Sequence, residues 1–219
     1  MTNINKNLNL KGEISLITGA TRGIGKSIAE VFARAGSTVI GTATTKEGAE
    51  RITANLSDAG LKGRGVVLDI SQSEQISSQI KELKKSDLMP SILVNNAGIS
   101  LESLLMRIKE DDWEKMISTN LSSAFFLCKA VIGPMLKKRH GRIINIGSIQ
   151  GTIGAIGHAH YSAAKAGLVG LTKSLAREVG SRGITVNTIA PGYIITDMTK
   201  DIGDEINKSL LKQIPLERF

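Results

Sequence analysis

The sequence predicts an α/β protein in which a doubly wound parallel β-sheet is flanked by helices on both faces. Short apolar runs rich in Ile and Val alternate with longer amphipathic stretches along the whole chain. Strands that alternate with helices form βαβ units, and almost continuously apolar strands are typical of a parallel sheet covered on both faces. No linker, repeat or low-complexity segment interrupts this pattern, so we expect one domain spanning residues 1–219.

The expected elements follow one another in a regular order. Strands are predicted at residues 13–18, 38–42, 65–69, 92–95, 142–147 and 184–189, and helices near residues 23–35, 46–59, 73–86, 111–139 and 161–181. Right-handed crossovers between successive strands then give the doubly wound arrangement. The stretch 191–215 has mixed helical character and follows a strand end, which is where a lid over a ligand site would lie.

The composition is that of an ordinary globular protein, with 41% hydrophobic and 22% charged residues. The N-terminal residues are polar, and no apolar run approaches the roughly 18 residues of a membrane span, so we predict neither a secretory signal nor a span. The expected location is the cytoplasm. The only cysteine, Cys128, lies in an apolar helical run and is interpreted as a small core residue. No metal site is predicted.

The net charge of +8 raises the question of an acidic partner. The excess is diffuse, because residues 1–110 carry 14 basic against 11 acidic side chains and residues 111–219 carry 14 against 9. The densest basic cluster, residues 137–142, lies at a predicted helix end, where cations also favour the helix dipole. With aromatic residues at only 3%, this distribution argues against nucleic-acid binding.

A glycine-rich turn joins the first predicted strand to the first predicted helix. The run TGATRGIG occupies residues 18–25, and its loop residues are Gly19, Thr21, Arg22, Gly23, Ile24 and Gly25. The glycines let the backbone turn tightly and approach a pyrophosphate, whose charge the helix N-terminus stabilises. This position, after a strand and before a helix, predicts a dinucleotide-binding site.

The end of the second strand indicates which dinucleotide binds. A carboxylate there would bind the 2′-hydroxyl of NAD, but this strand ends in small hydroxyl residues such as Thr44. Thr44 leaves room for a 2′-phosphate, and Arg22 and Lys46 could supply charge, so NADPH is favoured over NADH. Asp69, followed by Ile70, is placed to accept from the adenine amino group, or else caps the next helix. The small residues Asn96, Ala97 and Gly98 would let the backbone lie against the cofactor.

Three side chains suggest proton chemistry. Tyr161 and Lys165 are four residues apart on a predicted helix, and side chains at this spacing share a face. A fixed cation lowers the pKa of a phenol from its ordinary value of about 10. Ser148 ends a buried strand and could place its hydroxyl beside that phenol. Taken alone, the pair has a simpler explanation, a tyrosine packed on the core with a solvated lysine.

The motifs together resemble the short-chain dehydrogenase/reductase family. In order, the chain carries TGATRGIG, NNAG at 95–98, Asn120, Ser148, Tyr161-x-x-x-Lys165 and the PG-x-x-x-T run of Pro191, Gly192 and Thr196. The resemblance covers essentially the whole chain and implies a Rossmann-like fold. The runs GTATT, LLMR, KKRHGRI, SLAREV, SRGITVN and APGYI are most similar to those of bacterial reductases that act on 3-oxoacyl groups thioesterified to acyl carrier protein.

The resemblance implies a role for each matching residue. Tyr161 would protonate the substrate oxygen while Ser148 stabilises its charge, and Lys165 would bind the nicotinamide ribose and lower the pKa of the phenol. Asn120 would hold a water linked to Lys165, or make a structural hydrogen bond in a helix kink. After Pro191 and Gly192, Ile194 and Thr196 would contact the nicotinamide carboxamide. Arg139 and Arg182, expected near the rim of the site, would meet the acidic carrier protein.

Two features depart from the family pattern. Before Tyr161, relatives commonly have Gln-Ala-Asn, whereas this chain has His158, Ala159 and His160, either as loop residues or as groups that titrate near neutral pH. The sequence given stops at Phe219, where relatives continue through a helix and a seventh strand, so we expect a sheet without that strand. An exposed edge would then put the family's homotetramer in question.

The sequence leaves three functions open. The first is NADPH-dependent reduction of a 3-oxoacyl group on acyl carrier protein. The second is reduction of acetoacetyl-CoA, a sugar or another small ketone, since the catalytic residues would be the same. The third is a non-catalytic cofactor-binding scaffold.

Overall fold

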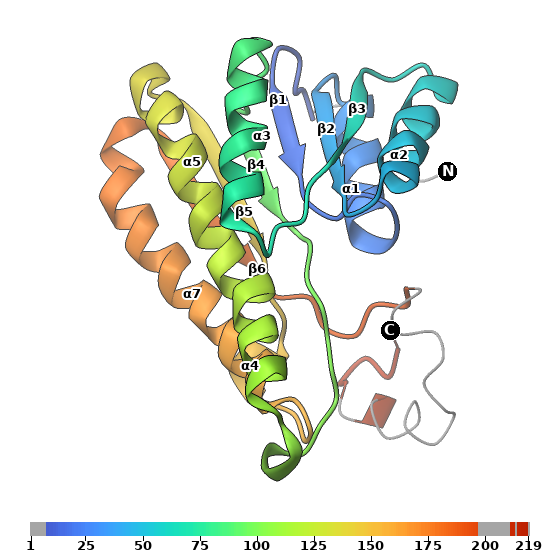
Figure 1. Ribbon diagram of the computed structural model, residues 1–219, viewed down its shortest axis with the longest axis vertical. Helices are drawn as coiled ribbons and strands as arrows, with labels where there is room; N and C mark the ends of the chain where they lie inside the picture. Colours follow the sequence, from blue (N-terminus) through green and yellow to red (C-terminus); the bar gives the residue numbers. More distant parts are fainter. Residues whose placement is uncertain (1–7, 197–210, 213, 219) are drawn as a thin grey trace.

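The computed structural model describes residues 8–196, 211–212 and 214–218, and within them one parallel sheet organises the chain (Figure 1). Its strand order is β3-β2-β1-β4-β5-β6, and every neighbouring pair is parallel. The strands are β1 Ile14–Ile17, β2 Thr38–Ala43, β3 Gly63–Val67, β4 Ile92–Asn95, β5 Gly141–Ile146 and β6 Ile184–Ile189. The predicted α/β fold with its doubly wound parallel sheet is confirmed.

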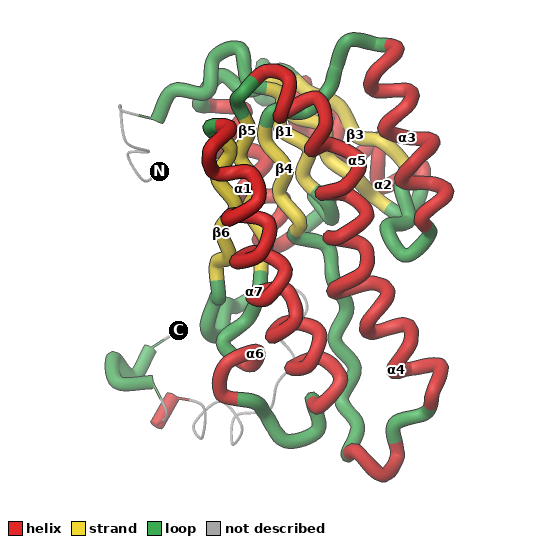
Figure 2. The backbone as a smooth tube through the Cα atoms, turned by 90° about the vertical axis from the view of Figure 1, so that its left-hand side faces the viewer, coloured by secondary structure: helices red, strands yellow, loops and turns green. Residues whose placement is uncertain are grey.

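Helices cover both faces of the sheet, as the apolar strands predict. The helices are α1 Gly23–Arg34, α2 Lys46–Asp58, α3 Ser73–Lys85, α4 Glu110–Ile117, α5 Ser123–Lys138, α6 Gln150–Ile153 and α7 Ala159–Val179, with short 3-10 turns at Leu105–Arg107 and Gly180–Arg182. Helices α1 and α2 pack on one face, and α3, α5 and α7 pack on the other. Figure 2 shows α3, α5 and α7 side by side in front of the strands. Because β1 lies between β2 and β4, the strand order reverses there, and ligands of such sheets bind at the carboxyl ends of the strands around that point.

The predicted helix at 111–139 is interrupted in the structure. Helix α4 ends at Ile117, a π-helical segment spans Ser118–Ser122, and α5 follows in line with α4 (Figure 1). The side chain of Asn120 leaves the helical surface to hydrogen-bond the backbone of Ile99. A π-bulge of this kind is common at functional sites, and it corresponds to the helix kink that was one of the two roles expected for Asn120.

The run Glu110–Lys138 is the one described helix that is long and apolar enough to cross a membrane by length and composition. Its apolar side chains have a different explanation in this structure. Leu127, Cys128, Val131 and Met135 are buried in the core between α5 and the sheet. The burial of Cys128 confirms its interpretation as a core residue.

Other boundaries differ by small amounts from those predicted. Strand β3 begins two residues early at Gly63, because Val39 already pairs with it, and α7 begins at Ala159 rather than at residue 161. The short helix α6 was not predicted. Most of the expected lid at 191–215 lies outside the described residues. Within the described residues the sheet has six strands and no seventh.

Candidate active site

The glycine loop crosses the carboxyl end of β1. The backbone N–H of Gly19 donates to Thr42 Oγ1 at 3.2 Å, which ties the loop to β2. Gly19 and Gly23 have φ of +67° and +54°, a left-handed conformation that favours glycine. A Cβ at Gly25 would lie only 2.2 Å from the Gly19 carbonyl oxygen. The loop therefore needs glycine at these positions in order to fold back on itself at the start of α1.

The first turn of α1 offers backbone donors at the loop. The residue before the helix, Arg22, is extended and makes no side-chain capping hydrogen bond. The first N–H groups of a helix have no intrahelical partner, and together with the helix dipole they attract anions. This cradle of glycines, which added Cβ atoms would fill, fits the pyrophosphate of a dinucleotide.

The NNAG run braces this loop. The Asn96 amide donates to the carbonyl oxygens of Thr18 at 2.8 Å and Gly19 at 3.2 Å. In return, Thr18 Oγ1 accepts from the backbone N–H groups of Asn96 and Ala97, both at 2.9 Å. The side chain of Asn96 thus fixes the carboxyl ends of β1 and β4 relative to each other, and any contact of Asn96 or Ala97 with a cofactor stays a prediction.

The end of β2 fits a 2′-phosphate. Thr44 and Arg22 are exposed, and no carboxylate follows the strand before Glu47. Thr45 Oγ1 is used to cap α2, accepting from the backbone N–H of Gly48 at 3.1 Å. Lys46 forms a 3.8 Å exposed ion pair with Glu50, a contact that a phosphate could replace at little cost.

Asp69 and Ile70 lie at the carboxyl end of β3, but their side chains are already engaged. The Asp69 carboxylate accepts from the Ser71 backbone N–H at 3.0 Å, the Ser71 hydroxyl at 2.7 Å and Gln72 Nε2 at 3.3 Å. The carboxylate thus orders the turn that leads into α3, but it does not cap the helix, whose N-cap residue is Gln72 and which has no side-chain capping hydrogen bond. Ile70 is 6% exposed and packs in the core, so only its backbone could reach a cofactor.

Ser148, Tyr161 and Lys165 come together beyond the carboxyl end of β5. The Ser148 side chain lies beside the Tyr161 phenol and favours a lower pKa of that phenol. Ser148 Oγ accepts from the Gln150 backbone N–H at 3.2 Å. One turn along α7, Lys165 is 5% exposed, and its Nζ donates to the Ile146 carbonyl oxygen at 2.8 Å. Nζ lies 5.6 Å from the centre of the Tyr161 ring. The lysine is buried, which contradicts the simpler explanation of a solvated lysine.

Burial controls the ionisation of this group. It raises the pKa of Tyr161, and the Ser148 hydrogen bond offsets part of that rise. It also lowers the pKa of Lys165 to about 8. The expectation that Lys165 lowers the pKa of the phenol is therefore wrong for this arrangement, because the ammonium is directed at the Ile146 carbonyl and the phenolate loses its hydration. Tyr161 is a protonated phenol at neutral pH, the form that donates a proton.

Asn120 lies in the π-helical segment and is 3% exposed. Its amide pairs with both backbone groups of Ile99: Oδ1 accepts at 3.1 Å and Nδ2 donates at 2.9 Å. A Cβ at Gly98 would lie 2.4 Å from Asn120 Oδ1 and 3.6 Å from Lys165 Nζ, so Gly98 lies between the two side chains. The structural hydrogen bond expected for Asn120 is present, and its link to a water stays a prediction.

The segment after β6 returns to the glycine loop. The Pro191 carbonyl oxygen accepts from the Ile149 backbone N–H at 3.0 Å. A Cβ at Gly23 would lie 3.5 Å from Thr196 Cγ2, which places Thr196 against the first turn of α1. Gly192 and Ile194 lie between these anchors, and Ile194 is 44% exposed. The segment thus bridges the catalytic loop and the nucleotide loop, as contacts with a nicotinamide require.

Arg139 and Arg182 lie at the opposite end of the sheet. Arg139 caps α5 in a left-handed conformation and donates to the Ser181 carbonyl oxygen at 2.9 Å, and Arg182 ends the 3-10 turn just before β6. The six residues of β5, about 20 Å of strand, separate Arg139 from Ser148. The expectation that these arginines lie at the rim of the active site is wrong within one chain. Their contact with a carrier protein remains a prediction.

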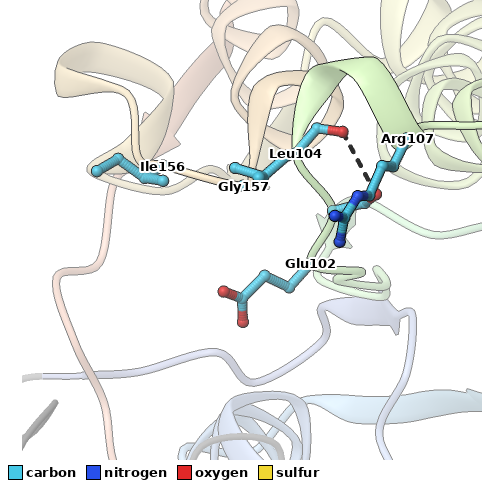
Figure 3. A pocket seen from close by; sticks show the side chains of 6 residues that line it. Glu102, Leu104, Arg107, Ile156 and Gly157 are labelled. Carbon is cyan, nitrogen blue, oxygen red and sulfur yellow. Dashed lines mark hydrogen bonds between the residues drawn. The ribbon is translucent and has the colours of Figure 1, made fainter.

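A cavity of about 350 Å³ lies beside the catalytic helix, and sequence reasoning missed it (Figure 3). Its lining residues are Glu102, Ser103, Leu104, Arg107, Ile156 and Gly157. The Ser103 backbone N–H donates to the Gly157 carbonyl oxygen at 2.9 Å and so joins its two walls. Gly157 immediately precedes His158, the N-cap of α7, so the cavity borders the start of the helix that carries Tyr161. The LLMR run was its only sequence signal.

The two histidines before Tyr161 have different surroundings. The His158 ring packs edge-on to Tyr161 with the centroids 6.1 Å apart, and its Nδ1 lies 3.0 Å from the Ile156 carbonyl oxygen. His160 is fully buried, and neither ring nitrogen has a hydrogen-bond partner. Burial, followed by the nearby His158, lowers the pKa of His160, while Asp112 raises it. His160 is therefore neutral at pH 7.

A dinucleotide cradle beside a serine, a tyrosine and a buried lysine at one sheet edge defines a nicotinamide-dependent oxidoreductase of the Rossmann type. Residues 13–207 match the family model of the short chain dehydrogenases, and the chain belongs to this family. It is 52% identical over 212 residues to the 3-oxoacyl-(acyl-carrier-protein) reductases FabG of Vibrio cholerae and Escherichia coli K12, which covers 97% of this chain and 86% of each relative. The Pseudomonas aeruginosa FabG is 50% identical over the same shares.

The fold also matches a crystal structure from Agrobacterium tumefaciens that is provisionally assigned as a gluconate dehydrogenase. The TM-score is 0.94 at 30% sequence identity, with 97% of this chain and 85% of that chain covered.

Proposed function

We propose that this chain reduces a 3-oxoacyl group on acyl carrier protein to the 3-hydroxyacyl thioester, with NADPH as cofactor, in the elongation cycle of fatty acid biosynthesis in the cytoplasm. The observation that carries this proposal is the grouping of Ser148, Tyr161 and the buried Lys165, which is one turn along α7 from Tyr161, at the sheet edge that also carries the glycine loop. The FabG relatives at 50–52% identity support the choice of substrate.

The chain's residues divide the reaction between them. NADPH supplies the hydride when bound. Tyr161 transfers its proton to the carbonyl oxygen as that oxygen becomes negative, and the Ser148 hydroxyl donates a hydrogen bond to the same oxygen. The Lys165 ammonium, which donates to the Ile146 carbonyl oxygen, would hold the ribose hydroxyls of the cofactor. Asn120 holds the helix turn in which a water can connect Lys165 to solvent.

The surroundings of the cavity favour an acyl substrate over a sugar. Leu104, Ile153 and Ile156 are 49%, 69% and 89% exposed around the start of α7. Exposed apolar side chains gathered beside a cavity mark a binding surface, and an alkyl chain would cover them. The cavity wall also carries Glu102 and Arg107, which could bind the polar part of a substrate (Figure 3).

One assay separates this function from its alternatives. NADPH oxidation is measured with acetoacetyl thioesterified to acyl carrier protein, with acetoacetyl-CoA and with a keto-sugar acid, the substrate class raised by the structural relative from Agrobacterium. We expect the highest kcat/KM with the carrier thioester. Preference for the sugar acid overturns the acyl assignment, and NADPH binding without turnover of any substrate supports the scaffold.

Partner contacts and assembly belong to the same proposal. Arg139 and Arg182 would meet the acidic carrier, and a homo-oligomer, a tetramer in the family, could bring them near another chain's active site. Phe125 and Phe126 of α5 are 45% and 37% exposed, which leaves an apolar helix face for such a contact. The double variant Arg139→Ala, Arg182→Ala should lower kcat/KM for the carrier thioester but not for acetoacetyl-CoA. An equal effect on both substrates contradicts the carrier role.

A further inference from the structure

A row of polar side chains crosses the core beneath the active site. Asn95 pairs in register with Asn145, and Asn145 with Thr188, on the neighbouring strands β4, β5 and β6. Two residues closer to the amino ends of these strands, the same face of the sheet carries Leu93, Ile143 and Val186. Their side chains are 0%, 0% and 5% exposed and belong to the core under α5 and α7. A polar row in such a layer is costly unless its members are hydrogen-bonded.

The row converges on a single hydroxyl. Asn95 Nδ2 donates to Asn145 Oδ1 at 2.7 Å, and Asn145 Nδ2 donates to Thr172 Oγ1 on α7 at 2.8 Å. Thr172 Oγ1 also lies 2.6 Å from Thr188 Oγ1 and donates to the Leu168 carbonyl oxygen at 2.7 Å. A hydroxyl has one proton and two acceptor lone pairs, so with Thr188 as donor Thr172 is fully satisfied.

The position of Thr172 connects it to the reaction. It follows Lys165 by seven residues, two turns along the same helix face, or about 10 Å. Its partner Asn145 is on β5, three residues before Ser148, which follows the strand. The other side-chain hydrogen bond between α7 and β5 is the one from Lys165 Nζ to the Ile146 carbonyl oxygen. Two polar links two turns apart fix both the rotation of α7 and its position along its axis, which apolar packing alone fixes less sharply.

We propose that Thr172 is a positioning residue, whose hydroxyl holds α7 against β5 and thereby sets the position of the Tyr161 phenol relative to Ser148. The inference rests on the proposed reductase function for its kinetic consequences. Its structural consequence can be measured without any turnover.

The kinetic test compares Thr172→Val with Thr172→Ser. Valine has the shape of threonine but no hydroxyl, and it leaves Asn145 Nδ2 without an acceptor. We expect Thr172→Val to lower kcat for the carrier thioester about tenfold with the KM for NADPH unchanged, and Thr172→Ser to restore most of the rate. Val179→Ala is the stability control, because Val179 is buried on α7 outside the polar row and should lower Tm without lowering kcat.

The spectroscopic test uses the fact that the chain has two tyrosines, Tyr161 and Tyr193. In a Tyr193→Phe background, the ultraviolet absorbance of tyrosinate reports Tyr161 alone. The Ser148 hydrogen bond lowers the pKa of Tyr161, so its loss should move the titration to higher pH in Thr172→Val and not in Val179→Ala or Thr172→Ser.

The inference is overturned if Thr172→Val keeps the wild-type kcat and titration while losing only Tm, as Val179→Ala does. It is also overturned if serine restores neither the rate nor the titration. Absence of reductase activity in the wild-type chain would instead contradict the proposed function, and the titration would still decide the role of Thr172.

Discussion

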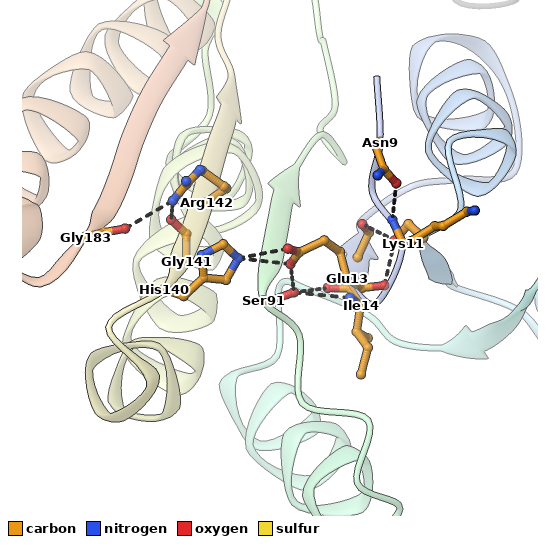
Figure 4. A network of polar contacts seen from close by, with 11 residues as sticks. Asn9, Lys11, Glu13, Ile14, Ser91, His140, Gly141, Arg142 and Gly183 are labelled. Carbon is orange, nitrogen blue, oxygen red and sulfur yellow. Dashed lines mark hydrogen bonds and ion pairs between the residues drawn. The ribbon is translucent and has the colours of Figure 1, made fainter. Parts of the chain in front are cut away.

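The two ends of the parallel sheet differ in how completely their polar side chains are hydrogen-bonded. At the amino end, the Glu13 carboxylate before β1 accepts hydrogen bonds from Ser91 before β4 and from His140 before β5, and Arg142 donates to the carbonyl oxygens of Gly141 and Gly183 (Figure 4). At the carboxyl end lie all the buried polar side-chain atoms without a partner among the described residues, which belong to Asn95, Gln150, His160 and Ser162. Both ends connect strands through side chains, but only the carboxyl end also keeps buried hydrogen-bonding capacity unused among the described residues.

The direction of the chain explains this difference. In a βαβ unit each helix begins near the carboxyl end of the preceding strand, so the N-termini of α1 and α7 both face this edge with their partial positive charge. Anions and developing negative charge are stabilised there and not at the other end. Unpaired buried groups lower stability, so their concentration at one edge indicates that this edge is shaped for a ligand.

The largest expected effect is at the carboxyl end. Tyr161→Phe removes the proton donor and should lower kcat at least 10³-fold, about 4 kcal/mol of transition-state stabilisation, within the range of a general acid. The dissociation constant of NADPH, measured by fluorescence titration, should change less than threefold, because the ring and Lys165 remain. A variant with a near-normal rate would contradict the role of Tyr161.

The ionisation of Lys165 should make the free energy of unfolding depend on pH in the alkaline range. Its pKa is lowered from 10.5 to about 8, so between these values the unfolded chain binds a proton that the folded chain has released. The free energy of unfolding of the wild type relative to that of Lys165→Met should therefore rise with pH from about 8 to 10.5, by about 3 kcal/mol. The comparison must be with Lys165→Met, because burial raises the pKa of Cys128 from 9.0 to about 11 and lowers the stability of both proteins as pH rises above 9. Urea unfolding of both proteins at several pH values measures this difference. A difference that does not change with pH would show that the burial of this lysine is not penalised.

The same lysine limits activity in the free enzyme. Above about pH 8 Lys165 loses the positive charge that would bind the ribose hydroxyls of the cofactor. The value of kcat/KM should therefore fall with an apparent pKa near 8. The pKa of Tyr161 is raised, so its ionisation cannot produce a limb at that pH. A limb only above pH 10 would contradict this assignment.

The sequence predicted the parallel sheet and the motifs at its carboxyl end better than it predicted the hydrogen bonds and the burial of individual side chains there. Alternation of strands and helices gave the parallel sheet, and TGATRGIG with Tyr161 and Lys165 marked the edge where ligands bind, because these signals depend on local spacing. The hydrogen bonds of Asn96 and Thr172 depend on strand register, which a single sequence does not state. The burial of Tyr161, which raises its pKa where a lowered pKa was expected, depends on packing by residues far away in the chain. Arg139 and Arg182 were misplaced by family resemblance, although the predicted strands at 142–147 and 184–189 already put both arginines at the amino ends and Ser148 at a carboxyl end.

His160 should make the carboxyl end sensitive to acid. Its pKa is lowered in the folded chain, so below the ordinary value of about 6.5 the unfolded chain takes up a proton that the folded chain resists. The free energy of unfolding should fall as pH decreases from 7 to 5. Asp112 on α4 opposes this fall and His158 adds to it. His160→Asn carries the residue common in relatives and should remove this part of the slope, while an unchanged slope in thermal unfolding would contradict the assignment.

The smallest effect is expected at the amino end, where changes should alter stability without altering catalysis. In a double-mutant cycle, Glu13→Ala and His140→Ala should show a coupling of about 0.5–1 kcal/mol, because the pair is 2.9 Å apart and the Glu13 side chain is only 24% exposed. The matched control is the Glu82 and Lys85 pair on α3, at 2.7 Å but with side chains 58% and 73% exposed, whose coupling should be near zero. The kcat of every variant should stay within twofold of wild type, because the strands tied by Glu13 place the catalytic groups only at their far ends. If Glu13→Ala lowered kcat at a temperature where it remains folded, the two ends of the sheet would be mechanically coupled, and the division of labour between them would not hold.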